Sequence, residues 1–176
     1  MHPARLFVLC GLPGSGKTTR AVELAERFDA VRMSADDWMG RLGTDIWDDA
    51  VRARIEIIQR DLAMPVLLAG TDVVIEWGTW ARSERDELRA LARRAGALAH
   101  LEFLDAPLDE LWDRVRTRGH EQSVGSRTIT HDDLAAWSAI IERPTANELH
   151  TYDPMPPVRS GERPGSPAYP YGSWRP

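Results

Sequence analysis

The chain contains a single lysine, Lys17, among its 22 basic residues, and a single cysteine, Cys10. One cysteine excludes an intramolecular disulfide and a multi-cysteine zinc cluster, and it fits a reducing compartment. The five histidines include no pair at metal-ligand spacing, so zinc chemistry has no support. No apolar run approaches the roughly 18 residues of a membrane-spanning helix, and no signal-peptide pattern opens the chain. We therefore expect a cytoplasmic protein with no membrane partner.

The composition is that of one globular domain with a net charge of −5. Hydrophobic residues make up 43% and charged residues 28% of the 176 residues, enough to bury a core beneath a solvated surface. The negative charge argues against a general nucleic-acid coat, although it leaves room for a local basic groove. Apolar periodicity is lost near the end, where seven of the 12 prolines lie from Pro154 onward. We expect a domain over residues 1–152 and a proline-rich tail over 153–176.

Short apolar runs alternate with longer segments of helical period along the chain. This order predicts an α/β fold with a mainly parallel sheet, because parallel strands need long, usually helical connections. We expect strands at 5–10, 30–33, 72–77 and 98–104, a polar turn at 34–37, and helices at 17–28, 46–69, 83–95, 107–118 and 131–142. The expected inward residues of the long helix are Ile46, Ala50, Val51, Ile55, Ile58 and Leu62.

The first expected strand runs into the segment 11–18, GLPGSGKT, which satisfies the phosphate-binding pattern G-x-x-x-x-G-K-[ST] at every defined position. A helix is expected next, so backbone N–H groups and the helix dipole converge on one spot suited to phosphate. Lys17 can reach the β and γ phosphates of a nucleotide, and the Thr18 hydroxyl can bind Mg²⁺. The pattern predicts a P-loop NTPase, a three-layer α/β/α sandwich. The expected nucleotide-binding residues are Gly11, Pro13, Gly14, Ser15, Gly16, Lys17, Thr18 and Thr19.

The single lysine narrows the class of nucleotide-binding protein. The guanine-recognition motif of G proteins, N-K-x-D, needs a second lysine, which the chain lacks. Protein kinases use a different glycine-rich loop, and their other motifs are absent. Composition bias accounts for arginine at the other basic positions, whereas a compact ammonium suits the phosphate loop better than a planar guanidinium. The sequence therefore favours ATP as the phosphoryl donor.

Phosphoryl transfer also needs a carboxylate that accepts the proton of the attacking hydroxyl. Asp36 and Asp37 follow the second expected strand at the sheet edge that carries the phosphate loop, because parallel strands end together. We favour Asp36 as the base, with Asp37 and Trp38 beside the acceptor. The alternative is that both acids only cap a helix beginning near Trp38. Glu76 ends the third expected strand, where it contacts Mg²⁺ or the acceptor unless it is simply a solvated acid.

An arginine-rich segment at about 114–130, RVRTRGHEQSVGSRTIT, resembles a lid that closes over bound substrates. Arg114 and Arg118 share one helix face and are candidates to stabilise charge on the transferring phosphoryl, and Arg127 is a candidate substrate contact. The alternative for each arginine is a solvated basic face. Four tryptophans fall in segments near the acceptor side, where they form either an aromatic platform or part of the core. They are Trp38, Trp47, Trp77 and Trp80.

Five segments, taken in order, resemble the small P-loop kinases described as AAA-type ATP-binding kinases: GLPGSGKTT, MSADDWM, DVVIEWGTWARSERDELR, FLDAPLDELWDRVRTR and IERPTANELHTYD. The group is similar to the kinase domain of phage polynucleotide kinase, to zeta-toxin-type kinases and to chloramphenicol phosphotransferase. Over residues 5–152 the resemblance implies ATP binding at 11–18, a base at Asp36, lid arginines at Arg114 and Arg118, and a position near the nucleotide or acceptor pocket for IERPTANE. Two positions depart from the pattern. Glu76 stands where Asp is common, and Met39 replaces an arginine of the polynucleotide kinase.

The leading hypothesis is an ATP- and Mg²⁺-dependent phosphotransferase that acts on a hydroxyl of a small molecule, such as a nucleoside-like, sugar or antibiotic compound. A kinase of nucleic-acid 5′-hydroxyl ends is a second hypothesis, disfavoured by the net charge and by Met39. A non-catalytic nucleotide-sensing or partner-binding module is the third. The motifs leave the identity of the acceptor and the oligomeric state open.

Overall fold

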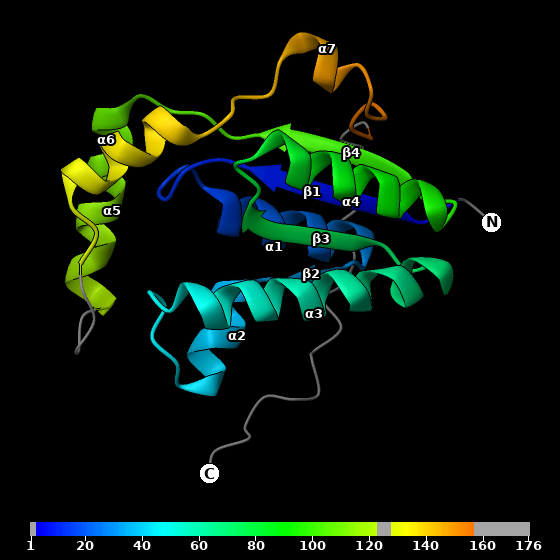
Figure 1. Ribbon diagram of the computed structural model, residues 1–176, viewed down its shortest axis with the longest axis horizontal. Coiled ribbons are helices and arrows are strands. Elements are labelled where there is room, and N and C mark those ends of the chain that lie inside the picture. Colours follow the sequence, from blue (N-terminus) through cyan, green and yellow to red (C-terminus); the bar gives the residue numbers. More distant parts are fainter. Residues whose placement is uncertain (1–2, 123–127, 157–176) are drawn as a thin grey trace.

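The computed structural model describes residues 3–122 and 128–156, with side chains up to residue 117 in the first segment. Four parallel strands form one sheet in the order β2-β3-β1-β4, so the first strand of the sequence lies inside the sheet (Figure 1). This order confirms the predicted parallel α/β fold. The strands are β1 (Arg5–Cys10), β2 (Val31–Met33), β3 (Val73–Gly78) and β4 (Leu98–Phe103).

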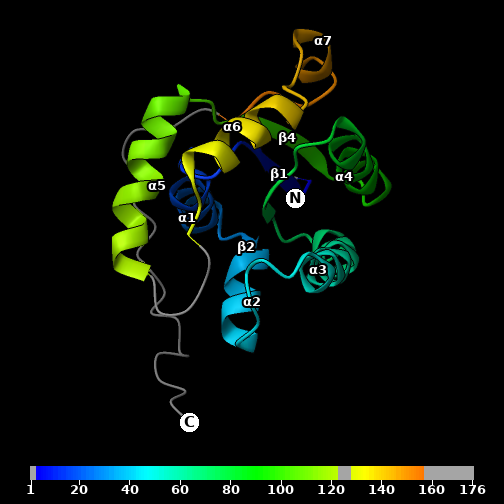
Figure 2. The same cartoon turned by 60° about the vertical axis from the view of Figure 1, so that its left-hand side comes forward.

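Helices cover both faces of the sheet and also lie beyond one end of it. The helix α1 packs on one face, and α3 and α4 pack on the other (Figure 2). Helices α5 and α6 lie beside each other beyond one end of the strands (Figure 1), where Leu111 and Leu134 join the core that α3 and α4 share. The predicted three-layer sandwich is therefore correct. The helices in the described residues are α1 (Lys17–Phe28), α2 (Ala35–Leu42), α3 (Asp49–Leu68), α4 (Arg82–Arg94), α5 (Leu108–Gln122), α6 (His131–Ile140) and α7 (Ala146–Leu149).

Strand β1 is buried on both faces, which explains why its sequence is an unbroken apolar run. Leu6, Val8 and Cys10 point into the core shared with α3 and α4. Phe7 and Leu9 alternate with them and pack against Ala21 and Leu24 of α1. This two-sided burial anchors the end of β1, and with it the start of the loop that follows, in the core of the domain.

The parallel register brings four chain segments to one edge of the sheet. Cys10 lies opposite Phe103 of β4 and Gly78 of β3, and Met33 of β2 lies opposite Ile75. The loops that leave these strands therefore emerge on the same side, as expected for parallel strands. Any chemistry shared by these loops is assembled at this edge.

Helix α2 corrects the expected polar turn at 34–37. Ser34 is the N-cap residue, and its hydroxyl accepts a hydrogen bond from the Asp37 N–H at 3.3 Å. The helix begins directly afterwards at Ala35, which places Asp36 and Asp37 in its first turn. Acidic side chains there interact favourably with the helix dipole. The alternative, a helix beginning near Trp38, therefore predicted a helix correctly, but the helix begins three residues earlier, at Ala35.

The inner face of α3 differs from the expected one. Its buried residues recur every four positions at Ile55, Gln59, Ala63 and Leu67, whereas Ile58 and Leu62 are 50% and 42% exposed. Ile46 lies before the helix begins and is exposed. The buried stripe includes Gln59, a polar residue that a pattern of apolar residues cannot identify. Its side chain is buried because it donates a hydrogen bond to the Ser34 carbonyl and accepts one from the Trp77 indole. The set Ile46, Ala50, Val51, Ile55, Ile58 and Leu62 was therefore wrong except for Ile55 and the partly buried Val51.

The predicted lid and tail are described only in part. Helix α5 extends through Gln122, so the first half of the segment 114–130 is helical. A capping box formed by Thr130 and Asp133 opens α6. Arg127 and the residues from 157 onward lie outside the described residues. Within the described part of the chain, no helix is long and apolar enough to cross a membrane.

Candidate active site

The phosphate-binding loop connects β1 to α1 in the predicted geometry. Gly16 has φ of 96°, in the left-handed region that favours glycine, and α1 begins at the next residue. A Cβ atom on Gly14, where φ is 82°, would lie 2.8 Å from the carbonyl oxygen of Leu111 in α5. No side chain caps the N-terminus of α1. The first N–H groups of the helix are therefore available for an anion.

Polar groups of the loop converge where a nucleotide phosphate would bind. Lys17 Nζ donates hydrogen bonds of 2.9 Å to the carbonyl oxygens of Gly11 and Leu12, within its own loop. The Ser15 hydroxyl is buried and has no hydrogen-bond partner among the described residues. A buried hydroxyl of this kind fits a phosphate oxygen, because buried polar atoms are costly unless they are hydrogen-bonded. Thr18 and Thr19 lie exposed in the first turn of α1.

The two acidic residues of α2 have different partners. Asp37 forms an ion pair of 2.7 Å with Arg32 of β2, and Arg32 also contacts Glu76 of β3 at 2.6 Å. Asp36 instead pairs with Arg52 of α3 at 2.7 Å, and its side chain is 72% exposed. Adjacent carboxylates on a helix point in different directions. Both side chains are exposed, Asp37 at 47% and Asp36 at 72%, but of the two only Asp36 has its ion-pair partner on another helix.

Glu76 is not a solvated acid at the end of its strand. Its side chain is 6% exposed and accepts a hydrogen bond from Arg32 Nε. Burial alone would lower the pKa of Arg32, but its contacts with Glu76 and Asp37 raise it above the ordinary value. Glu76 therefore links β3 to β2 and to the start of α2. The role of Arg32 could not be read from the sequence, because a three-residue strand carries too little pattern to show which face its middle residue occupies.

The residues present fit Mg²⁺ in part. Mg²⁺ in nucleotide sites keeps several waters and needs only one or two protein ligands besides the phosphates. The exposed Thr18 hydroxyl at the start of α1 meets that requirement. The Glu76 carboxylate is occupied by Arg32 at 2.6 Å. In the described residues, no group of three or more His, Cys, Asp or Glu side chains could hold a metal ion by itself.

A partly buried carboxyl group lies near Asp36. Burial raises the pKa of Glu56 in α3 to about 7, with further increases from the charges of Glu84 and Asp36 and an opposing effect of Arg52. Glu56 therefore titrates near neutral pH, close to the candidate base. It was missed because nothing in a helical sequence distinguishes a half-buried glutamate from a solvated one.

Tryptophans from three separate segments form an aromatic cluster. Trp47 stacks on Trp137 of α6 with ring centroids 6.1 Å apart, and Trp80 contacts Trp137 at 5.8 Å. The indole N–H of Trp80 donates to the Gly11 carbonyl of the phosphate-binding loop at 3.1 Å. Trp80 therefore joins this cluster to the phosphate-binding loop, and Trp47 belongs to it through Trp137, which the sequence did not single out. Trp77 packs in the core and donates to Gln59, as the alternative interpretation held.

Helix α5 lies against the phosphate-binding loop. Arg114 donates to the Gly14 carbonyl at 3.3 Å and pairs with Glu110 one helical turn earlier. Arg116 points elsewhere and pairs with Asp113. The side chain of Arg118 lies outside the described residues. Of the predicted lid arginines, the structure therefore brings Arg114 to the loop.

The segment IERPTANE packs against α4 and the turn before it. The Glu142 N–H donates to the Trp80 carbonyl at 3.0 Å, and the Glu142 carboxylate accepts from the Arg82 N–H at 2.9 Å. Glu148 is buried beside Arg85 of α4. The two glutamates of this segment are therefore occupied by protein groups around residues 80–85.

A family model described as an AAA domain, AAA_33, matches residues 6–144, which include the phosphate-binding loop, Asp36, Glu76 and Arg114 but not Glu148. The chain belongs to this family of P-loop, kinase-like AAA domains. The resemblance expected from the five sequence segments is thereby confirmed. Among curated proteins, no sequence matches the chain significantly.

Solved structures share the fold of this AAA domain. A chain in the Pnkp1/Rnl/Hen1 RNA repair complex aligns with a TM-score of 0.69 and 20% identity over 87% of this chain. The domain spans 47% of that protein, about half its length. A candidate kinase from Chloroflexus aurantiacus aligns with a TM-score of 0.64 and 22% identity, covering 78% of this chain and 76% of the other. The Mycobacterium tuberculosis APS kinase, solved with AMPPNP and APS, aligns with a TM-score of 0.56 and 21% identity, covering 74% and 79%.

Proposed function

We propose that this AAA domain is an ATP-dependent phosphotransferase that moves the γ-phosphoryl group of ATP to a hydroxyl of a small molecule. One observation carries the proposal: the phosphate-binding loop with Lys17 lies at the same sheet edge as an exposed carboxylate, Asp36, that belongs to no buried ion pair. A donor site and a proton acceptor at one edge are the two parts that phosphoryl transfer requires.

The donor half of the proposed reaction uses Lys17 and the loop N–H groups. Lys17 exchanges the carbonyl oxygens of Gly11 and Leu12 for the β and γ phosphates, a favourable exchange because an anionic acceptor makes a stronger hydrogen bond. Thr18 supplies the hydroxyl for Mg²⁺, which neutralises charge on the phosphates when bound. Arg114, already beside Gly14, stabilises charge on the transferring group, and Arg118 and Arg127 are proposed to assist from the rest of the lid.

The acceptor half uses Asp36 to orient the attacking hydroxyl and take its proton. Asp37 and Trp38 are proposed to contact the acceptor from the same helix, and we assign Glu76 a structural role before a metal-binding one, because Arg32 occupies its carboxylate. The residues 31–56 carry six acids and four arginines. This excess of negative charge suits a neutral or cationic acceptor and disfavours a polyanion.

The experiment is a screen of hydroxyl compounds for acceptor-dependent release of ADP, with the variants Lys17→Ala and Asp36→Asn as controls. Nucleosides, sugars and hydroxyl-bearing antibiotics form the first panel. Transfer by the native chain that disappears in both variants supports the proposal. Full activity in either variant would refute the assigned mechanism.

A kinase of nucleic-acid ends is the second candidate, supported by the fold shared with a chain of the RNA repair complex. Against it, Met39 is fully buried beside Ala35 and Ile55, so it offers no polar contact to a phosphate backbone. This candidate predicts labelling of 5′-hydroxyl oligonucleotides and binding that weakens steeply with salt. A non-catalytic module predicts ATP binding without turnover for any acceptor. We place the proposed enzyme in the cytoplasm, with residues 1–152 as its catalytic domain.

A further inference from the structure

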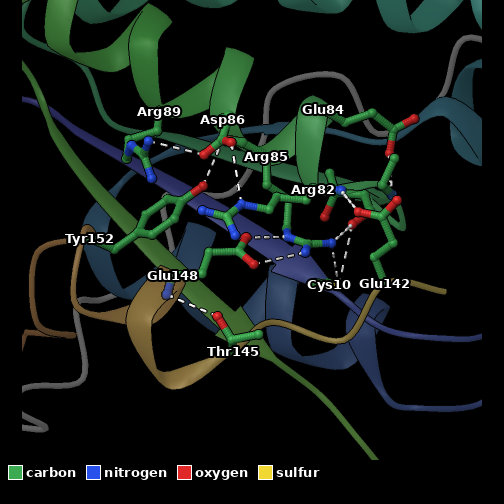
Figure 3. A network of polar contacts seen from close by, with 12 residues as sticks. Cys10, Arg82, Glu84, Arg85, Asp86, Arg89, Glu142, Thr145, Glu148 and Tyr152 are labelled. Carbon is green, nitrogen blue, oxygen red and sulfur yellow. Dashed lines mark hydrogen bonds and ion pairs between the residues drawn. The ribbon is translucent and has the colours of Figure 1, made fainter.

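The most deeply buried charges of the described chain form one ion pair between α4 and α7. Arg85 and Glu148 have side chains that are 0% and 1% exposed. Arg85 Nε donates to Glu148 Oε1 at 2.6 Å and Arg85 Nη2 donates to Glu148 Oε2 at 3.0 Å, so the pair is bidentate (Figure 3). Tyr152 donates from its hydroxyl to the Arg85 carbonyl at 2.7 Å. A buried ion pair contributes little net stability, because the cost of desolvating both charges offsets their attraction. Stability alone therefore does not explain why Arg85 and Glu148 are buried together.

The remaining nitrogen of Arg85 holds the turn that follows β3. Arg85 Nη1 donates to the carbonyl oxygens of Thr79 at 2.9 Å and Trp80 at 3.0 Å. Thr79 has φ of 41°, a left-handed conformation that is strained for a β-branched residue. Such a conformation persists only where surrounding contacts enforce it, and the Thr79 hydroxyl adds a hydrogen bond to the Leu9 carbonyl at 3.1 Å.

This turn places the indole of Trp80 on the phosphate-binding loop. The Trp80 N–H and the Lys17 ammonium both donate to the Gly11 carbonyl, at 3.1 Å and 2.9 Å. Gly78 permits the approach, since a Cβ atom there would lie 3.1 Å from the indole nitrogen. If Lys17 turns to a phosphate, the indole N–H remains as a donor to the Gly11 carbonyl. The loop then keeps its shape, and the buried carbonyl keeps a partner.

We propose that Arg85 and Glu148 are positioning residues of the nucleotide site. They hold the Thr79–Trp80 turn so that the Trp80 indole stays hydrogen-bonded to Gly11 when Lys17 engages ATP. The inference rests on the proposed function, because it requires that the loop binds ATP. It assigns a role to the segment IERPTANE, whose Glu148 reaches the nucleotide site only through Arg85 and Trp80.

Two variants separate positioning from stability. The double substitution Arg85→Met with Glu148→Leu removes both charges and keeps similar volume, a replacement that is often neutral or stabilising for a buried pair. The substitution Trp80→Phe keeps an aromatic ring and removes only the N–H. We expect the affinity for ATP, measured by isothermal titration calorimetry, to fall about tenfold in each, because a buried carbonyl loses its donor in the bound state. Thermal unfolding of Trp80→Phe is expected to remain close to that of the native chain.

Matched controls use the same chemical changes elsewhere. Arg60→Met with Glu87→Leu removes an ion pair of 2.8 Å between α3 and α4, and Trp112→Phe changes a half-buried indole of α5. Both controls are expected to bind ATP as the native chain does. If the native chain binds ATP and Trp80→Phe binds it with the same affinity, the inference is overturned, whether or not the double variant folds. Absence of ATP binding by the native chain overturns the proposed function itself.

Discussion

The proposed donor and acceptor sides of the site are built in different ways. On the donor side, Lys17 contacts carbonyl oxygens only six and five positions earlier in the sequence. On the acceptor side, Arg32 reaches a glutamate 44 positions away, and Asp36 depends on an arginine from another helix. The donor loop is therefore a local structure whose motif can be recognised in sequence. The acceptor side is a product of tertiary packing, so its polar contacts leave no local pattern in the sequence.

On both sides the charged side chain, Lys17 or Asp36, is bound to other groups of the protein, but these contacts differ in strength. The ammonium of Lys17 rests on neutral carbonyl groups, which an anionic phosphate easily replaces. The carboxylate of Asp36 rests on the guanidinium of Arg52, a pair that is exposed and so contributes little stability. An acceptor hydroxyl can therefore approach Asp36 at small cost, whereas the buried Glu76 pair resists such an exchange.

The strongest way to break the donor side is Lys17→Ala. We expect ATP-dependent turnover to fall by about 10³, because a preorganised charge on the transferring phosphoryl is lost. Lys17→Arg is the matched variant and is expected to recover only a small part, since a planar guanidinium fits a point-charge position poorly. Steady-state ADP release measures both. Native turnover in Lys17→Ala would place the chemistry outside this loop.

The acceptor side is tested by comparing Asp36→Asn with Asp37→Asn. We expect Asp36→Asn to lower kcat by about 10² with little change in ATP affinity, because the proton acceptor is lost. Asp37→Asn should lower kcat less than tenfold, since that carboxylate mainly contacts Arg32. Acceptor-saturated kinetics give both values. Equal losses in the two variants would contradict the assignment of distinct roles.

Removing Glu76 tests whether it is structural. Glu76→Gln leaves Arg32 facing Asp37 alone, and we expect the free energy of unfolding to fall by about 2–3 kcal/mol, less than for a fully buried pair because Arg32 is 22% exposed. Urea unfolding at low salt measures the change. Unaltered stability together with a raised Mg²⁺ requirement for turnover would assign Glu76 to the metal instead.

The smallest expected effect concerns pH and Glu56. Its pKa in the folded chain is about 7, above the ordinary 4.5, so the protonated form is favoured by folding. Its contribution is fully favourable below about pH 4.5 and is lost as the pH rises through 7. We expect Glu56→Gln to gain on the order of 1–2 kcal/mol over the native chain at pH 8 and little at pH 4. A gain that is independent of pH would show that Glu56 does not titrate in this range.

Some elements could be predicted from the sequence and others could not. The bounds of β1 and α1 were predicted to the residue, because an apolar run, a glycine-rich loop and a helical period follow one another without ambiguity. The start of α2 was misjudged, since a serine and two aspartates suit a turn as well as a capped helix. The four-residue helix α7 was missed because one turn carries no period. Arg85, Gln59 and Glu148 look like surface residues in sequence, yet all three are buried.

The sequence alone determined the fold class, the phosphate-binding loop and the family, because each is carried by patterns within contiguous segments of the chain. Tertiary structure decided which charges meet. It paired Asp36 with Arg52 and buried Glu76 in an ion pair with Arg32. It also connected Glu148 to the phosphate-binding loop through Arg85 and Trp80. The physical reason is that the partner of a charged side chain depends on the packing of whole elements, which no local pattern encodes. The single lysine could be recognised from sequence, whereas the buried pair could not.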